Sequence, residues 1–217
     1  MHKPNFLLEE DVRESLDWDP MLDDSRVVVT ADDGRVILSG AVATFGEVER
    51  AAMDVHGVDG VKALDNELMV GLIGAAIADS DIAAAGAAAL DDDRLVPKGS
   101  VHATVDDGYV TLTGEVRRHF QRRAAEHTVG RVAGVRGVTN LVTLTEEPIP
   151  SDVAARINKA FERNAILDSS LIKVSNEGHT IYLDGTADSW AAMDAAVDTA
   201  WDAPGVTEVV NRLILIS

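Results

Sequence analysis

The sequence predicts an α+β protein made of three tandem αββαβ units, each a three-stranded mixed sheet with two helices on one face. Three observations support this prediction. A spacing of 20 residues between two glycines and 6 more to an asparagine occurs three times. A turn of an acidic residue and glycine lies upstream of the first glycine in each copy, and the strand after that turn alternates apolar and polar residues. The three sets of marks are Gly40, Gly60 and Asn66; Gly114, Gly134 and Asn140; and Gly185, Gly205 and Asn211.

A repeat of about 70 residues is too long for a solenoid unit and fits a small domain. The predicted domains are therefore residues 1–73, 74–147 and 148–217. The chain is 46% hydrophobic but only 4% aromatic, so the cores must consist of Val, Leu, Ile and Ala. A unit of this size buries only about 60% of its unfolded surface, which makes docking between copies an expected source of stability.

Each unit is predicted to begin with a helix and to carry a second helix after its hairpin. The first helices are expected at Leu7–Asp17, Asp81–Asp91 and Ser151–Arg163, with Ser151 as the N-cap of the third. The second helices are expected at Phe45–His56, Phe120–Val132 and Ser189–Trp201. An inward stripe of Trp190, Met193, Val197 and Trp201 is predicted for the last of these helices. The Gly-Val pairs that follow are interpreted as helix stops.

The hairpins place apolar residues on one face of each second strand. The predicted inward residues are Val36, Leu38, Val110, Leu112, Ile181 and Leu183. The glycine after each of these strands lacks a side chain, which suggests close approach of a helix. The last strands are expected at Val61–Val70, Val135–Leu144 and Val206–Ile216. Ile37 and Tyr182 fall on the opposite face, where apolar area would mark a docking site.

The charge balance excludes nucleic acid as a partner by long-range attraction. The net charge is −18, divided as −10, −3 and −5 among the three predicted domains. Such a field repels nucleic acid and anionic membranes at a distance, so any anion contact must be local. The chain has no cysteine, which excludes disulfides and thiolate metal sites.

The sharpest local feature is a run of basic residues at the start of the second helix of the middle copy. It comprises Arg117, Arg118, His119, Arg122 and Arg123, and Arg131 and Arg136 follow it. Backbone N–H groups at a helix start add to an anion-binding field, so these five residues are the candidate anion or lipid site. The alternatives are a solvated surface or ion pairs with the acidic first copy. Arg122 aligns with apolar Val48 and Met193, which leaves open whether this helix is rotated or its buried stripe begins at Phe120.

Other motifs favour structural roles. Gly57–Gly60 and Gly134–Gly137 match the G-x-x-G clamp of KH-type RNA domains, but here the loop runs from helix to strand. Asp91–Asp93 lacks the spacing of a calcium loop, and the six histidines have no metal-ligand spacing. No metal or cofactor is therefore expected. Trp18 is expected to cap a core. No constellation of nucleophile and base is evident, so catalysis would need an unmarked acidic cleft.

The repeated marks resemble those of the BON family (bacterial OsmY and nodulation domain). The resemblance rests on Val36–Val42, Val110–Val116 and Ile181–Ala187, together with the closing glycine and asparagine of each copy. It implies a non-enzymatic binding module for anionic phospholipid membranes or envelope-associated partners, often in stress-related proteins. Many members are periplasmic. A protein scaffold that self-associates through exposed sheet faces is the alternative.

The location expected from the sequence is the cytoplasm, or the surface of the inner membrane. The first ten residues lack a signal-peptide core. The apolar stretch Leu68–Leu90 contains Asp79 and Asp81, and repeat alignment divides it between the end of a strand and the start of a helix. No membrane span is therefore predicted.

Overall fold

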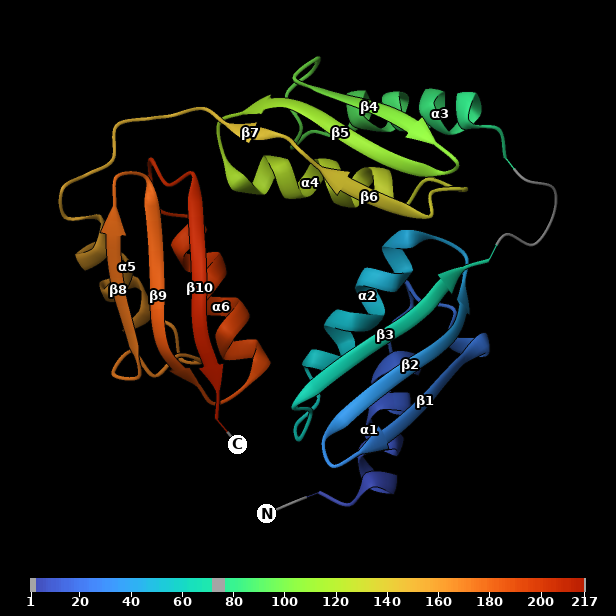
Figure 1. The fold of residues 1–217 in the computed structure, drawn as a ribbon, viewed down its shortest axis with the longest axis horizontal. Helices are drawn as coiled ribbons and strands as arrows, with labels where there is room; N and C mark the ends of the chain where they lie inside the picture. The colour runs from blue at the N-terminus through green and yellow to red at the C-terminus, as the bar shows by residue number, and fades with distance from the viewer. Residues whose placement is uncertain (1–2, 72–76, 217) are drawn as a thin grey trace. The chain divides into compact units, whose positions relative to one another are not determined.

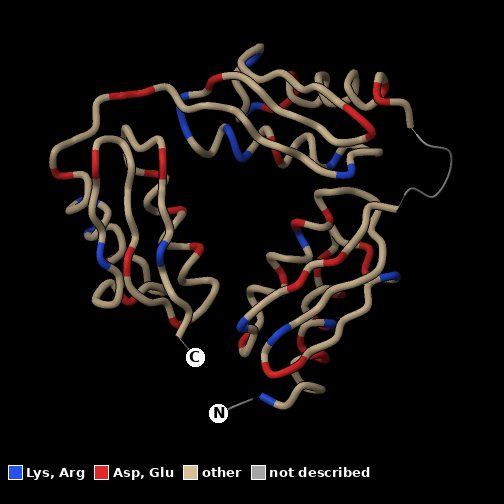
Figure 2. Tube along the Cα trace, viewed as in Figure 1, with Lys and Arg blue, Asp and Glu red and all other residues tan. Residues whose placement is uncertain are grey.

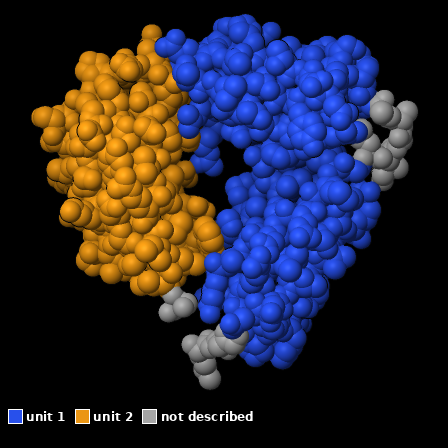
Figure 3. Space-filling model, viewed as in Figure 1, with its two compact units in different colours: residues 1–116, 121–143 blue, residues 117–120, 144–217 orange. Residues whose placement is uncertain are grey.

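The computed structural model describes residues 3–71 and 77–216. By contacts between its elements, the chain forms two compact units, which Figure 3 colours separately. The first unit comprises residues 1–116 and 121–143, and the second comprises residues 117–120 and 144–217. The strands form three sheets, one for each repeat, and the helices of each repeat lie on one face of its sheet (Figure 1). The predicted α+β class is therefore confirmed, whereas the predicted domain bounds stay a prediction.

The first repeat lies in the first unit and has the predicted order of elements. These are α1 (Asn5–Asp17), a short 3-10 turn (Asp24–Arg26), β1 (Val27–Asp32), β2 (Arg35–Val42), α2 (Phe45–His56) and β3 (Ala63–Val70). Strands β1 and β2 are antiparallel, and β3 joins β2 in parallel. Asp33 and Gly34 both have positive φ, as a tight hairpin turn requires.

The second repeat has the same order. Its elements are α3 (Asp79–Asp92), β4 (Val101–Asp106), β5 (Tyr109–Val116), α4 (His119–Gly130), β6 (Gly137–Asn140) and β7 (Thr143–Leu144). The last strand is in two pieces, β6 and β7, which both pair with β5, so the single strand predicted for Val135–Leu144 is wrong. Beyond the break, the side chain of Thr143 donates to the carbonyl oxygen of Gly114 at 3.1 Å, and this bond helps to hold the edge to the central strand.

The third repeat lies in the second unit. Its elements are α5 (Val153–Phe161), β8 (Ile172–Glu177), β9 (Thr180–Ala187), α6 (Trp190–Trp201) and β10 (Glu208–Leu215). The predicted N-cap Ser151 is wrong: the capping residue is Asp152, whose side chain makes no capping hydrogen bond. The core of this unit combines buried residues of α5, α6 and all three strands, with Phe161 fully buried.

The inward faces of the strands follow the predicted alternation, but two tryptophan predictions need correction. Val36, Leu112 and Ile181 are buried, as are their predicted partners. In α6 the buried side is made of Ala192, Met193, Ala196 and Ala200, while Trp190, Val197 and Trp201 pack at the edge of the core. Trp18 is 84% exposed, so it does not cap a core. Small alanines let α6 approach the sheet closely, and this leaves the bulky indoles at the margin.

The glycine after each inward pair is required by a backbone contact and not by a helix. Gly40, Gly114 and Gly185 have φ values of +117°, +135° and +129°. A Cβ on Gly114 would lie 2.0 Å from the carbonyl oxygen of Ser100, just before β4. A Cβ on Gly40 would lie 2.0 Å from the carbonyl oxygen of Arg26, and one on Gly185 would lie 2.1 Å from that of Leu171. The predicted helix approach at these positions is therefore wrong.

The repeated asparagine connects the last strand to the second helix. The amide of Asn66 donates to the carbonyl oxygen of Val48 at 3.0 Å, and that of Asn140 donates to Arg122 at 2.9 Å. The side-chain oxygen of each of the three asparagines accepts the backbone N–H two residues further on, at Leu68, Val142 and Leu213. The sequence showed only that the asparagine recurs at a fixed spacing, and the structure shows that its side chain forms these hydrogen bonds.

The repeated Gly-Val pair was predicted to end the second helix of each repeat. This prediction is wrong, because the pair lies beyond the end of that helix. Helix α2 ends at His56 with Gly57 as its C-cap. Gly60, Gly134 and Gly205 lie four residues beyond the ends of α2, α4 and α6, and take positive φ in the turn that leads to the next strand. In the first copy, the G-x-x-G segment is thus a helix end followed by a turn.

Candidate functional site

The predicted basic run is divided between the two units. Arg117 and Arg118 precede α4 and are exposed, and α4 begins at His119. Arg117, Arg118 and His119 belong to the second unit, whereas Arg122 and Arg123 belong to the first. Figure 2 shows Lys and Arg positions in blue, with several gathered at the start of α4.

In the second unit, two residues of the run have partners outside it. A guanidinium nitrogen of Arg118 lies 3.1 Å from a carboxylate oxygen of Glu147. The ring of His119 stacks on Trp201 with centroids 3.9 Å apart and planes 7° apart. Arg118 therefore has an acid partner at the end of the predicted second domain. Trp201 also has a role that the sequence missed, since its indole supports the start of α4.

In the first unit, Arg122 is half-buried and Arg123 is exposed. Burial lowers the pKa of Arg122, and the charge of Glu126 opposes this effect. The bond from Asn140 to Arg122 matches the bond from Asn66 to Val48, so α4 keeps the register of α2 and is not rotated. The stripe does not begin at Phe120, which is 48% exposed. An arginine thus occupies an apolar position, with its charge near the surface.

Arg123 faces the acidic first repeat. Burial raises the pKa of Glu49 in α2, the charge of Glu126 adds to this effect, and the charge of Arg123 opposes it. The charge of Arg123 thus acts on an acid of the first copy, and pairing of the run with that copy stays a prediction. Arg117 and Arg118 belong to the other unit, so the members of the run have different surroundings.

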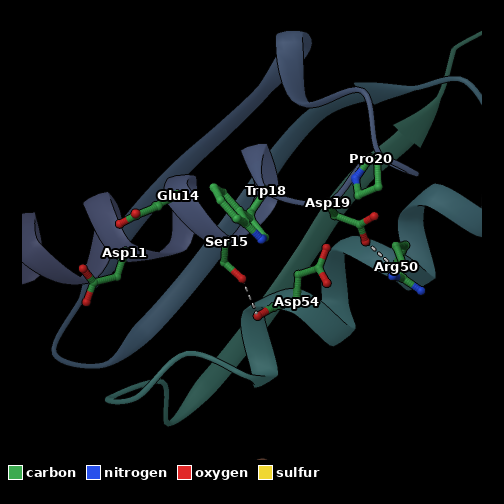
Figure 4. Close-up of a pocket in the computed structure, with 8 residues that line it drawn as sticks. All are labelled: Asp11, Glu14, Ser15, Trp18, Asp19, Pro20, Arg50 and Asp54. Atoms are coloured by element: carbon green, nitrogen blue, oxygen red, sulfur yellow. Dashed lines mark hydrogen bonds and ion pairs between the residues drawn. The ribbon is translucent and has the colours of Figure 1, made fainter.

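A hollow that the sequence did not predict lies beside α1 and α2 of the first unit (Figure 4). Its volume is about 660 Å³, and it is lined by Asp11, Glu14, Ser15, Trp18, Asp19, Pro20, Arg50 and Asp54. Most of these side chains come from the end of α1 and the turn after it, while Arg50 and Asp54 come from α2. The spacing of Arg50 and Asp54, one helical turn apart, is the only signal that the sequence carries for it.

Asp19 is the buried charge of this hollow, with 7% of its surface exposed. It accepts the backbone N–H of Met21 at 2.8 Å and forms an ion pair with Arg50. The Met21 bond first, and the Arg50 bond next, lower the pKa of Asp19. This ion pair ties the turn after α1 to α2, because the two residues are 31 positions apart in the chain.

Asp54 has the opposite tendency. Burial, followed by the charge of Asp19, raises the pKa of Asp54 to about 6. One of its carboxylate oxygens is buried without a hydrogen-bond partner among the described residues. A proton on Asp54 would satisfy that oxygen and remove repulsion from Asp19. The pair can therefore hold a proton up to a pH of about 6, and of the two carboxyl groups only that of Asp19 is buried.

The raised pKa of Asp54 predicts a pH-dependent stability. The folded protein keeps this proton at pH values where the unfolded chain has released it, so the stability contributed by Asp54 falls as pH rises from 3.8 to about 6. Asp54→Asn keeps a neutral group at every pH. We expect it to raise Tm by roughly 2 °C at pH 8, and to leave Tm near the wild-type value at pH 4, in thermal unfolding. The effect stays below about 1 kcal/mol because solvent screens a partly exposed carboxyl.

Asp59→Asn is the control for this experiment, since Asp59 is an exposed carboxyl of the same repeat. It removes one negative charge without touching the hollow. Equal gains in Tm at pH 4 and pH 8 for Asp54→Asn would contradict the assignment.

Two further properties concern metals and membranes. Across residues 3–71 and 77–216, the structure contains no cluster of three or more His, Asp or Glu side chains arranged to hold a metal ion. None of the helices in these ranges is long and apolar enough to span a bilayer. Residues 72–76, inside the apolar stretch Leu68–Leu90, lie outside the described residues.

The fold and the repeated marks define a protein of three tandem αββαβ modules. The family model of the BON domain matches residues 5–71, 78–146 and 151–216, which together span nearly the whole chain. The chain therefore belongs to the BON domain family.

The chain is similar in sequence to two curated proteins, and one solved structure was matched to it. The osmotically-inducible protein Y of Escherichia coli K12 is 29% identical over 187 residues, 82% of this chain and 92% of that protein. An uncharacterized protein in the gshII 5′ region of Anaplasma centrale is 28% identical over 123 residues, 54% of this chain and 82% of that protein. The solved structure is of CdsD, a structural protein of the type III secretion system of Chlamydia trachomatis. The match covers 95% of this chain and 91% of the CdsD chain, with 15% sequence identity and a TM-score of 0.27. That score is too low to support an inference.

Proposed function

We propose that this BON protein is a non-catalytic module that attaches to anionic phospholipid surfaces through the basic run of the middle repeat. The observation that carries the proposal is the concentration of Arg117, Arg118, Arg122 and Arg123 within seven residues of a chain whose net charge is −18. Arg117, Arg118 and Arg123 are exposed, so their charges are accessible to a headgroup. The arginines are therefore placed to act locally against an otherwise repulsive field.

The balance of charges determines the strength of this attachment. Each arginine near an anionic surface contributes about 1 kcal/mol, and the contribution decays within a Debye length of about 10 Å at 0.1 M salt. The acidic remainder of the protein opposes approach to the membrane. Binding is therefore expected to be weak and to disappear as the salt concentration rises.

Liposome flotation tests this proposal. Changing Arg117, Arg118, Arg122 and Arg123 to Ser is expected to lower partition onto vesicles of phosphatidylglycerol and phosphatidylcholine by roughly tenfold or more, since about 1.4 kcal/mol corresponds to tenfold. The matched control changes four other arginines to Ser: Arg35, Arg136, Arg156 and Arg212. Each of the four is exposed and forms an ion pair with its own acid. The control variant therefore has the same net charge as the variant of the run, but it keeps all the arginines of the run.

Binding that is unaffected by the four changes in the run would eliminate attachment through this surface. Binding lost equally in both quadruple variants would show that only net charge matters. In the first case a protein of the envelope becomes the partner to seek, by affinity capture with the intact chain.

The proposal extends to osmotic stress. Support comes from the name of the Escherichia coli relative, an osmotically-inducible protein, which matches 82% of this chain. An increase in the abundance of this protein after hyperosmotic shift is expected, and quantitative mass spectrometry of native cells measures it.

A further inference from the structure

A second, smaller hollow lies inside the first unit, where the start of α2 meets the end of α4. Its volume is about 190 Å³, and its polar lining is Thr44, Glu47, Arg50, His127 and Arg131. The first three residues belong to the first repeat and the last two to the second. We call it the inter-repeat hollow. It is distinct from the basic run, none of whose five residues lines it.

Two glycines bring the helices close enough to form the inter-repeat hollow. A Cβ on Gly46 would lie 3.5 Å from the carbonyl oxygen of Gly130, and a Cβ on Gly130 would lie 3.6 Å from the backbone nitrogen of Gly46. Both glycines are buried. Because the backbones approach at this point, side chains one turn away on each helix converge on the same space.

Three of the side chains that line the hollow are basic: Arg50, His127 and Arg131. Burial lowers the pKa of His127, and the charges of Arg131, Arg50 and Arg123 lower it further. The same hollow is lined by His127 and by guanidinium groups of both repeats, Arg50 and Arg131. Within residues 3–71 and 77–216, neither His127 nor Arg131 forms an ion pair, although the chain has 37 Asp and Glu against 19 Lys and Arg. Glu47 also lines the hollow and Arg50 pairs with Asp19, but the two basic side chains of the second repeat have no such pair among the described residues of so acidic a chain, and this points to an anion from outside it.

The carboxylates near the inter-repeat hollow are already engaged. Glu47 accepts the backbone N–H of Ala43 at 2.7 Å, and Asp19 binds the Nε of Arg50. Asp93, whose charge slightly raises the pKa of His127, accepts from Thr128 and from the backbone N–H of Leu95. The start of α2 adds positive potential, even though Thr44 accepts one of its N–H groups.

The dimensions favour a small ligand. Pockets for drug-sized molecules measure about 300–1,000 Å³, well above the volume of this hollow. Guanidinium groups bind tetrahedral oxyanions through charge-assisted hydrogen bonds, and an imidazolium adds one more. A phosphate group therefore fits the charge, the donors and the size.

We propose that the inter-repeat hollow binds a phosphate-type oxyanion, with Arg50, Arg131 and His127 donating to its oxygens from both repeats. The anion is either a free phosphate or the terminal phosphate group of a lipid. Binding links the first two repeats, because neither repeat alone supplies all three cations. None of the three donors belongs to the basic run, so either proposal can fail without the other.

Titration of the intact chain with sulfate tests the site in solution. Sulfate stays a dianion between pH 5 and 8, so any pH dependence of its binding comes from the protein. Sulfate is expected to raise the pKa of His127, followed by NMR of the imidazole ring, because the anion stabilises the imidazolium. Arg131→Gln is expected to weaken binding roughly tenfold in calorimetry, since it removes a charged hydrogen-bond donor.

Arg136→Gln is the matched control, because Arg136 belongs to the same repeat but pairs with Asp107. A second arm uses vesicles that contain phosphatidate, whose headgroup is a phosphate monoester. Loss of sulfate binding in Arg131→Gln but not in Arg136→Gln supports a site for free anions. Loss confined to phosphatidate vesicles supports a lipid phosphate.

The proposal is overturned if neither probe alters the titration of His127, or if the two variants bind alike. His127→Gln provides an independent variant, and it should also bind sulfate more weakly than the control. A variant with Arg117 and Arg118 changed to Ser should retain sulfate binding, because neither residue lines the hollow. A loss there would mean that the run, and not this hollow, holds the anion.

Discussion

Gly114→Ala is expected to unfold the middle repeat. The φ of Gly114 is +135°, a region that costs other residues about 1–3 kcal/mol. A Cβ there would lie 2.0 Å from the carbonyl oxygen of Ser100, a backbone atom that no side-chain rotation can move away. Together these effects should exceed about 4 kcal/mol, whereas a domain of this size has only about 4–10 kcal/mol of stability. Hydrogen exchange at β4 and β5 measures the loss.

Gly99→Ala is the matched control for this change. Gly99 lies in the same repeat and also has a positive φ, of +72°, but a Cβ on it meets no atom within 4 Å. It should therefore cost only the backbone strain, about 1–2 kcal/mol. If the two variants prove equally stable, the carbonyl contact is not the reason for glycine at the equivalent positions of the three repeats.

Phe161→Ala is expected to destabilise the second unit by about 3–5 kcal/mol. Phe161 is fully buried at the end of α5 and packs within the core of the third repeat. Losing the ring removes its transfer free energy and leaves a cavity among side chains that cannot all move to fill it. Urea unfolding followed by tryptophan fluorescence measures the effect, because Trp190 and Trp201 both adjoin this core.

The same variant tests whether the third repeat is an independent domain. Amides of β8–β10 should exchange faster in Phe161→Ala, while those of β1–β3 keep their wild-type protection. Ile166→Ala, at a side chain that is 56% exposed in the same unit, should change little. Equal loss of protection in both units would contradict independent folding, and with it the predicted domain bounds.

The sequence alone predicted the repeated fold because its signals are local and occur three times. Alternation in the strands identified buried residues such as Leu38, Leu112 and Leu183, since the side chains of a strand point alternately to its two faces. The bounds of α2 were predicted to the residue, and the family resemblance was confirmed by the match to three regions. The basic run could be seen as well, because its members are neighbours in the chain.

The partners of those residues depended on tertiary structure. The repeated glycine and asparagine are visible in the sequence, but the contacts that require them are not. The glycine of the middle repeat avoids a clash with Ser100, and the asparagines donate to the second helices. Trp18 was expected to cap a core and is exposed, and the buried side of α6 consists of three alanines and Met193. Residue type is a weak guide here, because burial depends on which helix face the backbone turns toward the sheet.

Local patterns thus determined the elements, their order and their inward faces, because each depends on residues a few positions apart. Only the folded chain brought Asp19 to Arg50, and Arg50 to His127 and Arg131. The residues of these groups come from different helices, and the last group from different repeats. Their proximity depends on how closely two backbones approach, which packing decides and no spacing along one segment encodes.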